Sequence, residues 1–327
     1  MKKPFLITLL TAALLMIGVT KTSELLSKKM AVIQKERQLT VDYYNRGSTF
    51  YQEGDYDFAL ASYNEAIARN PKYVDAYLGR ALVYRETEEY QKAIADYNQA
   101  IKLYPQDAYI YLKRAFVYAQ IKQYEKIIPD LNEAIKIEPE NGYFYYLRGN
   151  NYYNLRQYDK AFADYDKSIS LIQPDLLAGS MSEGKNWVSY AFSGRALVYH
   201  QLNNLNKAIV DYREAIHRNS ESLLSLTNIG LIEYERGNLK SARRMWEETV
   251  AQEPQNVETL LALAVLFHTE GKSEALAMAE TALRLDPRYA NLEFLRDNLW
   301  GEQLLGDAQN LLETPEIKAL LLELQQL

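Results

Sequence analysis

The chain has 327 residues, of which 48% are hydrophobic, and its formal net charge of −6 corresponds to a pI near 5.4. Its 37 basic residues are spread along the sequence, so there is no basic stripe of the kind that binds nucleic acid. The absence of cysteine excludes disulfides, zinc–thiolate sites and thiol catalysis.

The N-terminus begins with Lys2 and Lys3 and continues as an apolar run, FLITLLTAALLMIGV, over residues 5–19. Such a start is typical of a targeting segment rather than of a folded domain. A helix of this length reaches about 22 Å, and the flanking residues bring it close to the ~30 Å of a membrane core. Because Lys21 stands where a cleavage site needs small residues, we favour an uncleaved signal anchor over residues 1–22.

The anchor hypothesis also predicts where the rest of the chain lies. A signal anchor keeps its short basic N-terminus in the cytoplasm, which would place the following residues on the extracytoplasmic side of a membrane. A cleaved signal peptide would instead leave a secreted or periplasmic protein. Residues 23–39 are charged and carry a partial apolar stripe, so they are predicted to form a helical spacer.

From residue 40 onwards, the sequence repeats a pattern of large and small apolar residues every 34 positions. The copy over residues 74–105 predicts two short amphipathic helices joined by a tight turn and closed by a proline. Seven positions of this copy carry similar residues 34 places earlier and later: Tyr77, Ala81, Tyr84, Ala93, Tyr97, Ala100 and Pro105. Neither helix could bury its apolar face alone, so the pattern predicts a stack of neighbouring helical hairpins.

Seven copies of the pattern, here called repeats, account for most of the remaining chain. Four run without a gap over residues 40–175, and three more cover residues 189–289. Residues 176–188 form an insertion between them, predicted to be a loop because of its glycine and serine content. Whether this loop is an inert surface insertion, a hinge or a binding loop is open. The leucine-rich remainder, residues 290–327, predicts a helical cap that closes the core.

The period of 34, with small residues where helices touch and aromatic residues where they interlock, resembles the tetratricopeptide repeat (TPR) family. The resemblance covers all seven copies. It implies an all-α fold, a right-handed α-solenoid of about seven helix–turn–helix repeats with a helical C-terminal cap. The tail LRDNLWGEQLLGDAQNLLETPEIKALL also resembles the ends of TPR proteins from cyanobacteria.

The sequence contains no recognisable catalytic or cofactor-binding motif. Its three histidines, His200, His217 and His268, lie far apart and lack the spacing of metal ligands. There is no glycine-rich phosphate loop and no nucleophile elbow, and carboxylates on such helices usually form a solvated face. We therefore expect a protein that is not an enzyme and has no cofactor, metal or small-molecule substrate.

In the TPR family, the first helix of each repeat lines a concave groove that receives an extended peptide or a partner helix. The family's groove positions correspond in this chain to a set that is largely aromatic and amidic: Tyr44, Tyr51, Arg85, Tyr109, Phe116, Tyr143, Tyr146, Asn150, Tyr153, Asn154, Tyr190 and His200. Such groups suit a peptide held by stacking and by amide hydrogen bonds. Alternatively, many of these tyrosines simply pack between adjacent helices.

The resemblance thus implies a protein-interaction scaffold, held at a membrane by its N-terminus and supporting the assembly of a membrane or envelope complex. Nucleic acid is not expected among its partners, because the basic residues are dispersed. Two alternatives remain: a secreted, soluble binding protein, and the docking subunit of an enzyme complex.

One position departs from the family pattern in the same way in five successive repeats. It carries Arg46, Arg80, Arg114, Arg148 and Arg195. Sixteen residues further on, the sequence has Ser62 in the first of these repeats and an aspartate in the others: Asp96, Asp130, Asp164 and Asp211. We predict a structural ladder of Arg–Asp pairs that bridge the two helices of one repeat, or adjacent repeats.

Overall fold

The computed structural model describes residues 3–172, 187–219 and 222–325, with the side chains of the first helix described from Glu24 onward. In this part of the chain, the regular structure consists of seventeen α-helices and one short 3₁₀ helix, with no strand. The predicted all-α repeat architecture is therefore confirmed. The chain divides into two compact units, Met1–Glu138 and Pro139–Leu327.

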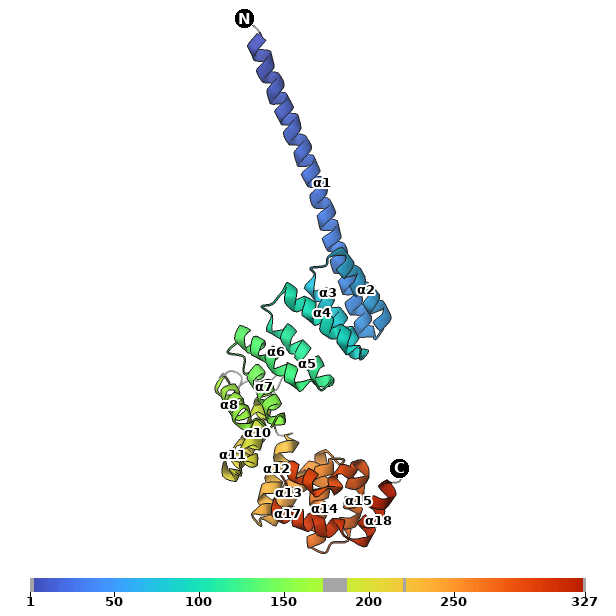
Figure 1. Ribbon diagram of the computed structural model, residues 1–327, viewed down its shortest axis with the longest axis vertical. Helices are drawn as coiled ribbons and strands as arrows, with labels where there is room; N and C mark the ends of the chain where they lie inside the picture. The colour runs from blue at the N-terminus through green and yellow to red at the C-terminus, as the bar shows by residue number, and fades with distance from the viewer. Residues whose placement is uncertain (1–2, 173–186, 220–221, 326–327) are drawn as a thin grey trace. The chain divides into compact units, whose positions relative to one another are not determined.

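The N-terminal unit contains three helical hairpins, in which we call the first helix of each repeat helix A and the second helix B (Figure 1). The hairpins are α1 (Lys3–Glu53) with α2 (Tyr56–Arg69), α3 (Val74–Glu86) with α4 (Tyr90–Leu103), and α5 (Ala108–Gln120) with α6 (Tyr124–Ile137). Helix α1 is far longer than the others, because the predicted spacer and helix A of the first repeat form one continuous helix.

The part of α1 that precedes the first hairpin extends well beyond α2 (Figure 1). Its apolar side chains Leu25, Leu26, Met30 and Ile33 are exposed. Within the part of the chain that the structure describes, no helix combines the length and the apolar character that crossing a membrane requires. The side chains of residues 1–22 lie outside that part, so the signal anchor stays a prediction.

The C-terminal unit contains four hairpins and the cap. The hairpins are α7 (Gly142–Asn154) with α8 (Tyr158–Ser170), α10 (Trp187–Gln201) with α11 (Leu205–Arg218), α12 (Leu223–Glu235) with α13 (Leu239–Gln252), and α14 (Val257–Thr269) with α15 (Glu274–Leu285). The cap consists of η1 (Pro287–Ala290), α16 (Leu292–Asp297), α17 (Glu302–Leu312) and α18 (Pro315–Leu324).

The insertion predicted at residues 176–188 is shorter than expected at its C-terminal end. Helix α10 begins at Trp187, so the last two residues of the predicted loop are helical. The aromatic ring of Trp187 explains this difference, since it packs against Gly142 at the start of α7. The rest of the insertion lies outside the described residues.

All seven hairpins use the same turn between helix A and helix B. One residue of each turn has a positive φ, and these residues are Gly54, Glu88, Lys122, Arg156, Asn203, Gly237 and Gly271. They lie 34 positions apart, except across the insertion. A left-handed backbone costs a residue other than glycine about 1–2 kcal/mol, so packing of the two helices must impose the turn in four of the repeats.

The core repeats one contact along the stack, a large side chain of helix B lodged between two A helices. Within the two units, these side chains are Tyr63, Tyr97, Tyr165, Tyr212 and Trp246, each no more than 2% exposed. Glycines make room for several of them. A Cβ on Gly149 would lie 3.0 Å from the Tyr165 ring, and a Cβ on Gly194, in the next helix A, would lie 2.5 Å from the same ring.

This packing predicts that Gly194→Ala destabilises the C-terminal unit. We expect the free energy of unfolding to fall by roughly 1–3 kcal/mol, because the Tyr165 ring must shift to admit the new methyl group. Urea denaturation followed by circular dichroism measures the change. The control is Gly306→Ala in α17, where the added Cβ would meet no neighbouring heavy atom within 4 Å. Alanine should stabilise this helix by up to ~1 kcal/mol. Equal stability of the two variants would contradict the proposed packing.

Candidate functional site

The Arg–Asp ladder predicted from the sequence is present and positions the A helices. Arg80 donates from Nε and Nη2 to the two carboxylate oxygens of Asp96, at 2.8 and 2.7 Å. The same two-pronged contact recurs in the other three pairs: Arg114–Asp130, Arg148–Asp164 and Arg195–Asp211. The four aspartates are only 3–6% exposed, and the fifth arginine, Arg46, contacts the Ser62 hydroxyl at 3.3 Å.

Several of these arginines also join neighbouring repeats, so both arrangements left open by the sequence occur. Arg80 Nη1 donates to Asn64 of the preceding helix B at 2.5 Å, and Arg195 Nη1 donates to Asp166 at 2.8 Å. The guanidinium of Arg80 also lies over the rings of Tyr77 and Tyr84, at 5.6 and 5.9 Å. In α3, α5 and α10, the ladder therefore fixes helix A, which carries candidate groove residues, relative to two B helices.

Removing one member of a pair tests the ladder. Asp96→Ala should lower the free energy of unfolding by roughly 2–3 kcal/mol, because the half-buried Arg80 guanidinium loses its charged partner. The double variant Arg80→Leu/Asp96→Ala should be more stable than Asp96→Ala alone, since it leaves no unpaired charge. Chemical denaturation of both variants measures the difference, and a double variant no more stable than Asp96→Ala would contradict the predicted pairing.

In the N-terminal unit, the five candidate groove residues lie on A helices, but they are not equally available. The ring of Tyr44 packs against those of Tyr63 and Tyr73, with centroids 5.9 and 5.5 Å apart. The other four divide into covered and exposed: Tyr51 packs on Tyr56, Arg85 pairs with Glu86, and Tyr109 and Phe116 are 48% and 39% exposed. Packing between helices therefore explains part of the set, as the alternative hypothesis predicted.

In the C-terminal unit, three of the candidate residues form a row of aromatic rings. Tyr146 lies between Tyr143 and Tyr190, with ring centroids 6.1 and 6.2 Å apart and interplanar angles of 28° and 27°. We call these three residues the tyrosine row. Tyr190, on α10, is 45% exposed, whereas the Tyr146 ring also packs against the ring of Tyr165 on helix B. The row thus joins helix A of the fourth repeat to helix A of the fifth.

Asn150 lies one helical turn beyond Tyr146 and is held in a fixed orientation. Its Oδ1 accepts a hydrogen bond from the Tyr165 hydroxyl at 2.7 Å. Burial raises the pKa of Tyr146, and a hydrogen bond with Asn150 partly offsets this effect. The amide is therefore part of the same surface as the tyrosine row.

The other candidate residues of these two repeats lie towards the C-terminal ends of α7 and α10. Tyr153 is half-buried against Tyr158, with ring centroids 5.5 Å apart, and Asn154 is exposed. His200 packs edge-on against Tyr212, and burial lowers the pKa of His200 to about 4. The imidazole is therefore neutral at physiological pH.

In the last two repeats, the cap occupies the face that would continue the groove. Helix α17 packs against α12 and α14, which are the A helices of these repeats. The Tyr234 hydroxyl donates to Asp307 at 2.7 Å, and Glu235 accepts hydrogen bonds from the backbone N–H groups of Gln303 and Leu304 at the start of α17. Leu304 and Leu311 of α17 are completely buried. The repeat pattern did not predict this occupied face.

The repeat register gives no clear signal for the occupied face. Glu235 stands at the position that carries Asn154 in the fourth repeat, and Glu258 stands at the position of Tyr143. The second repeat, however, also carries carboxylates at these two positions, Glu86 and Asp75, so the acidic residues alone do not mark the occupied face.

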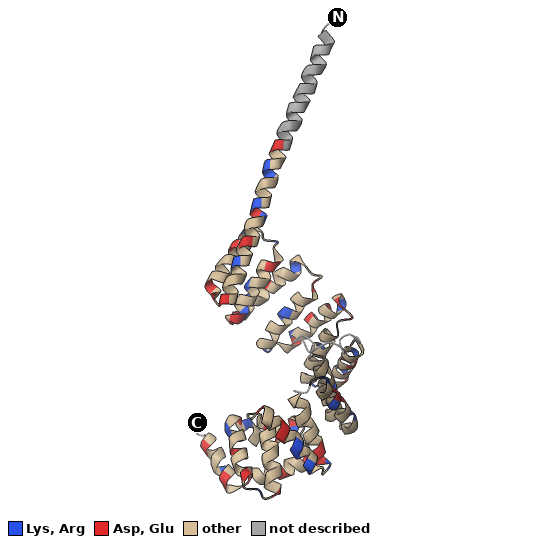
Figure 2. Ribbon diagram, turned by 180° about the vertical axis from the view of Figure 1, so that it is seen from behind, with Lys and Arg blue, Asp and Glu red and all other residues tan. Residues whose placement is uncertain are grey.

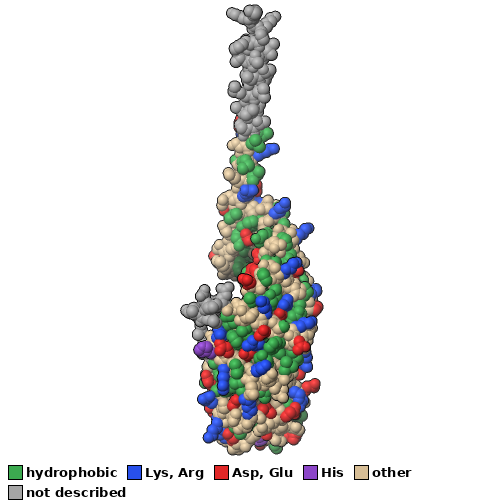
Figure 3. Space-filling model, turned by 90° about the vertical axis from the view of Figure 1, so that its left-hand side faces the viewer, with side chains coloured by type: hydrophobic (Ala, Val, Ile, Leu, Met, Phe, Trp, Pro, Cys, Tyr) green, Lys and Arg blue, Asp and Glu red, His purple; other side chains and the backbone are tan. Residues whose placement is uncertain are grey.

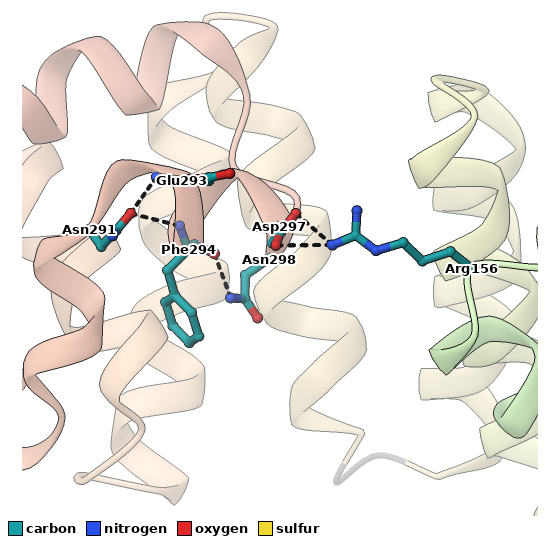
Figure 4. Close-up of polar contacts among 6 residues, drawn as sticks. All are labelled: Arg156, Asn291, Glu293, Phe294, Asp297 and Asn298. Carbon is teal, nitrogen blue, oxygen red and sulfur yellow. Dashed lines mark hydrogen bonds and ion pairs between the residues drawn. The ribbon is translucent and has the colours of Figure 1, made fainter. Parts of the chain in front are cut away.

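The cap also contacts the fourth repeat. Arg156, in the turn after α7, donates from Nη2 to both carboxylate oxygens of Asp297 at 3.1 Å (Figure 4). Asn291 caps α16 by accepting from the backbone N–H groups of Glu293 and Phe294, and so orders the segment that carries Asp297. Such an exposed pair contributes little stability. It nevertheless joins the cap to the turn that follows α7.

Glu258 links the cap to the seventh repeat by accepting a hydrogen bond from Trp300 Nε1 at 3.2 Å. Burial raises the pKa of Glu258 to about 7, although the hydrogen bond from the Trp300 indole by itself lowers this pKa. Because the carboxyl ionises at lower pH in the unfolded chain, the folded state loses stability as the pH rises from about 4.5 to 7.

Glu258→Gln should therefore stabilise the protein above pH 7. The amide cannot ionise and can still accept from Trp300, so the gain at pH 8 should be on the order of 1–2 kcal/mol. The gain should shrink towards pH 5, where Glu258 is protonated in the folded state. Thermal denaturation at the two pH values measures the difference, and Glu248→Gln on the exposed face of α13 is the control. A gain that does not change with pH would contradict this assignment.

The charges of the described residues do not suggest another kind of site. Basic and acidic residues are interspersed along the helices of both units in Figure 2, and the face drawn in Figure 3 mixes basic, acidic and apolar side chains. Among these residues, no group of three or more His, Cys, Asp or Glu side chains is arranged to hold a metal ion.

Comparison with known families identifies the repeat. Models described as tetratricopeptide repeat match residues 44–108, 96–128, 143–175, 191–221 and 227–290, which include parts of all seven hairpins. The chain belongs to the tetratricopeptide repeat family. The family explains the hairpins, but it does not specify a partner.

Individual TPR proteins are similar to parts of the chain. Tetratricopeptide repeat protein 1 of Schizosaccharomyces pombe is 30% identical over 105 residues, which are 32% of this chain and 9% of that protein. A solved TPR protein from Parabacteroides merdae ATCC 43184 has a TM-score of 0.59 and 17% identity, covering 83% of this chain and 99% of its own. YrrB, described as a TPR protein with an unusual peptide-binding site, has a TM-score of 0.47 and 18% identity, covering 61% and 96%.

Proposed function

We propose that this TPR protein is a non-catalytic scaffold that binds partner polypeptides on the open parts of its concave faces. The observation that carries this proposal is the tyrosine row with Tyr190, a large aromatic side chain exposed on a helix A. Tyr109 and Phe116 are exposed at groove positions in the N-terminal unit. Exposed aromatic groups next to oriented amides are typical of protein-binding surfaces.

The cap supports the same function from within the molecule. Helix α17 shows that the face built by A helices can bind a helix, with its N-terminus capped by Glu235 and its leucines buried. The corresponding face of the fourth and fifth repeats carries the tyrosine row and Asn150 instead of carboxylates. We therefore assign partner binding in the C-terminal unit to these two repeats.

The N-terminal segment motivates the rest of the proposal. Its basic start and apolar run favour a membrane anchor over residues 1–22, with the repeats on the extracytoplasmic side and a role in assembling a membrane or envelope complex. The tail sequence favours a cyanobacterial type of TPR protein. N-terminal sequencing of the mature protein distinguishes this form from a secreted one, because only the secreted form lacks the segment.

A photo-crosslinking residue at position 190 tests partner binding. Crosslinking in solubilised membranes should join one defined partner to this position, because Tyr190 borders the open groove. The same residue at position 104 is the control, since Tyr104 is 54% exposed but lies at the end of a helix B. Tyr190→Ala should abolish co-purification of that partner, whereas Tyr104→Ala should not. Identical crosslinks at both positions would contradict the proposed function.

A further inference from the structure

Helices α1 and α18 carry exposed faces of opposite charge and matching spacing. We propose that these faces bind each other between copies of the protein, so that the free part of α1 in one copy packs against α18 of the next. This contact is separate from the partner binding proposed for the groove, and it adds a second copy of the chain as a partner.

The free part of α1, residues 24–38, extends beyond the helix that pairs with it. Each of its side chains is exposed, and Val32 is 63% exposed. The stretch contains four basic and two acidic residues. Two of the basic residues, Lys28 and Lys35, lie seven positions apart and therefore on the same side of the helix. Together with the apolar residues between them, they form what we call the basic face: Lys28, Ala31, Val32 and Lys35.

Helix α18 presents the counterpart, which we call the acidic face: Glu316, Ala319, Leu320 and Glu323. These residues line one side of a hollow of about 480 Å³ between α15 and α18. The buried side chains of Ile317 and Leu320 give this hollow an apolar floor. Glu280 and Arg284 lie on its α15 side, so its lining holds three carboxylates and one cation.

The two faces match in spacing as well as in charge. In each of them, a charged residue is followed by apolar residues three and four positions later and by a second charge of the same sign after seven. Seven residues of an α-helix advance about 10.5 Å, so both lysines of one face can meet both glutamates of the other. The small and branched apolar residues then pack between the two ion pairs, whether the helices run parallel or antiparallel.

The contacts that these charges already make can be exchanged. Lys28 Nζ lies 2.7 Å from Glu24 in its own helix, and Glu323 lies 3.0 Å from Arg284. All four side chains are exposed, and such pairs contribute little stability. The second charge of each face has no ion-pair partner among the described residues, so the contact between copies would provide its first.

Charge complementarity favours a second copy over an anionic lipid surface as the occupant. Lipid headgroups would meet Glu24 and Glu36 on the same stretch of α1, and they would leave the acidic face of α18 without a partner. Because the two faces differ, the contact is heterologous and joins copies head to tail. Two short helices bury a small area, so we expect a weak association that depends on salt.

Disulfide crosslinking tests the contact, because the chain has no cysteine of its own. Full-length copies in detergent micelles, one with Ala31→Cys and a differently tagged one with Ala319→Cys, should form a mixed dimer under mild oxidation. The control pairs Ala31→Cys with Leu322→Cys, which is 61% exposed on α18 but lies outside the acidic face. This control pair should crosslink about tenfold less, because a disulfide requires the two Cβ atoms to be close.

Charge reversal tests the same contact without cysteines. Lys28→Glu/Lys35→Glu should weaken self-association at least about tenfold in sedimentation velocity, because like charges then face each other. Glu316→Lys/Glu323→Lys should have the same effect, and an equal mixture of the two variants should associate again. Raising the salt concentration from about 0.05 M to 0.5 M should weaken association of the unmodified protein. Circular dichroism establishes that each variant is folded.

The outcomes that contradict the inference are distinct. If mixing the two reversed variants does not restore association, the faces do not meet. If Ala31→Cys copies crosslink with each other and not with Ala319→Cys, α1 pairs with α1 instead. If a chain with both cysteines crosslinks only within itself, the contact lies inside one copy. If charge reversal on α1 abolishes binding to vesicles of anionic lipid and leaves self-association unchanged, the occupant is a lipid surface. None of these results depends on crosslinking at position 190, so the proposed function is tested separately.

Discussion

The structure depends on one repeated contact, in which a large side chain of helix B fills the space between its own helix A and the helix A that follows in the same unit. Tyr63 and Tyr165 occupy this position against glycines of both neighbours, and Trp246 occupies it against Gly230. Because the contact needs the next repeat, no hairpin can complete its core alone. The Arg–Asp pairs act along the same seams, and together the two contacts fix the spacing of the A helices.

This contact also connects the core to the binding surface. The Tyr63 hydroxyl hydrogen-bonds with Ser48, and the Tyr165 hydroxyl donates to Asn150, so a core tyrosine orients a groove residue in each case. In the second and fifth repeats, the residue at the position of Asn150 is a leucine, and the hydroxyls of Tyr97 and Tyr212 are buried without a partner. The residue at this position therefore decides whether the tyrosine hydroxyl has a hydrogen-bond partner, while the tyrosine ring is buried in all four of these repeats.

The cap decides which part of the C-terminal unit is free to bind. By placing α17 on α12 and α14, it buries the A helices of the last two repeats and directs Glu235 and Glu258 to contacts within the chain. What remains open is the stretch with the tyrosine row. The function we propose for this unit thus follows from the contrast between a carboxylate-bearing face that binds the chain's own helix and an aromatic, uncharged face.

The sequence by itself determined the hairpins, their order, the helical cap and the Arg–Asp ladder. It could do so because these features depend on spacing within one repeat: a tight turn fixes helix B against helix A, and sixteen residues then always bring Arg80 to Asp96. Only the tertiary structure decided which candidate groove residues are covered and where the cap lies. Tyr44 and Tyr190 are both tyrosines at predicted groove positions, but Tyr44 packs between two other rings whereas Tyr190 is exposed. Their difference, like the position of α17, depends on contacts between segments far apart in the chain, which no local period encodes.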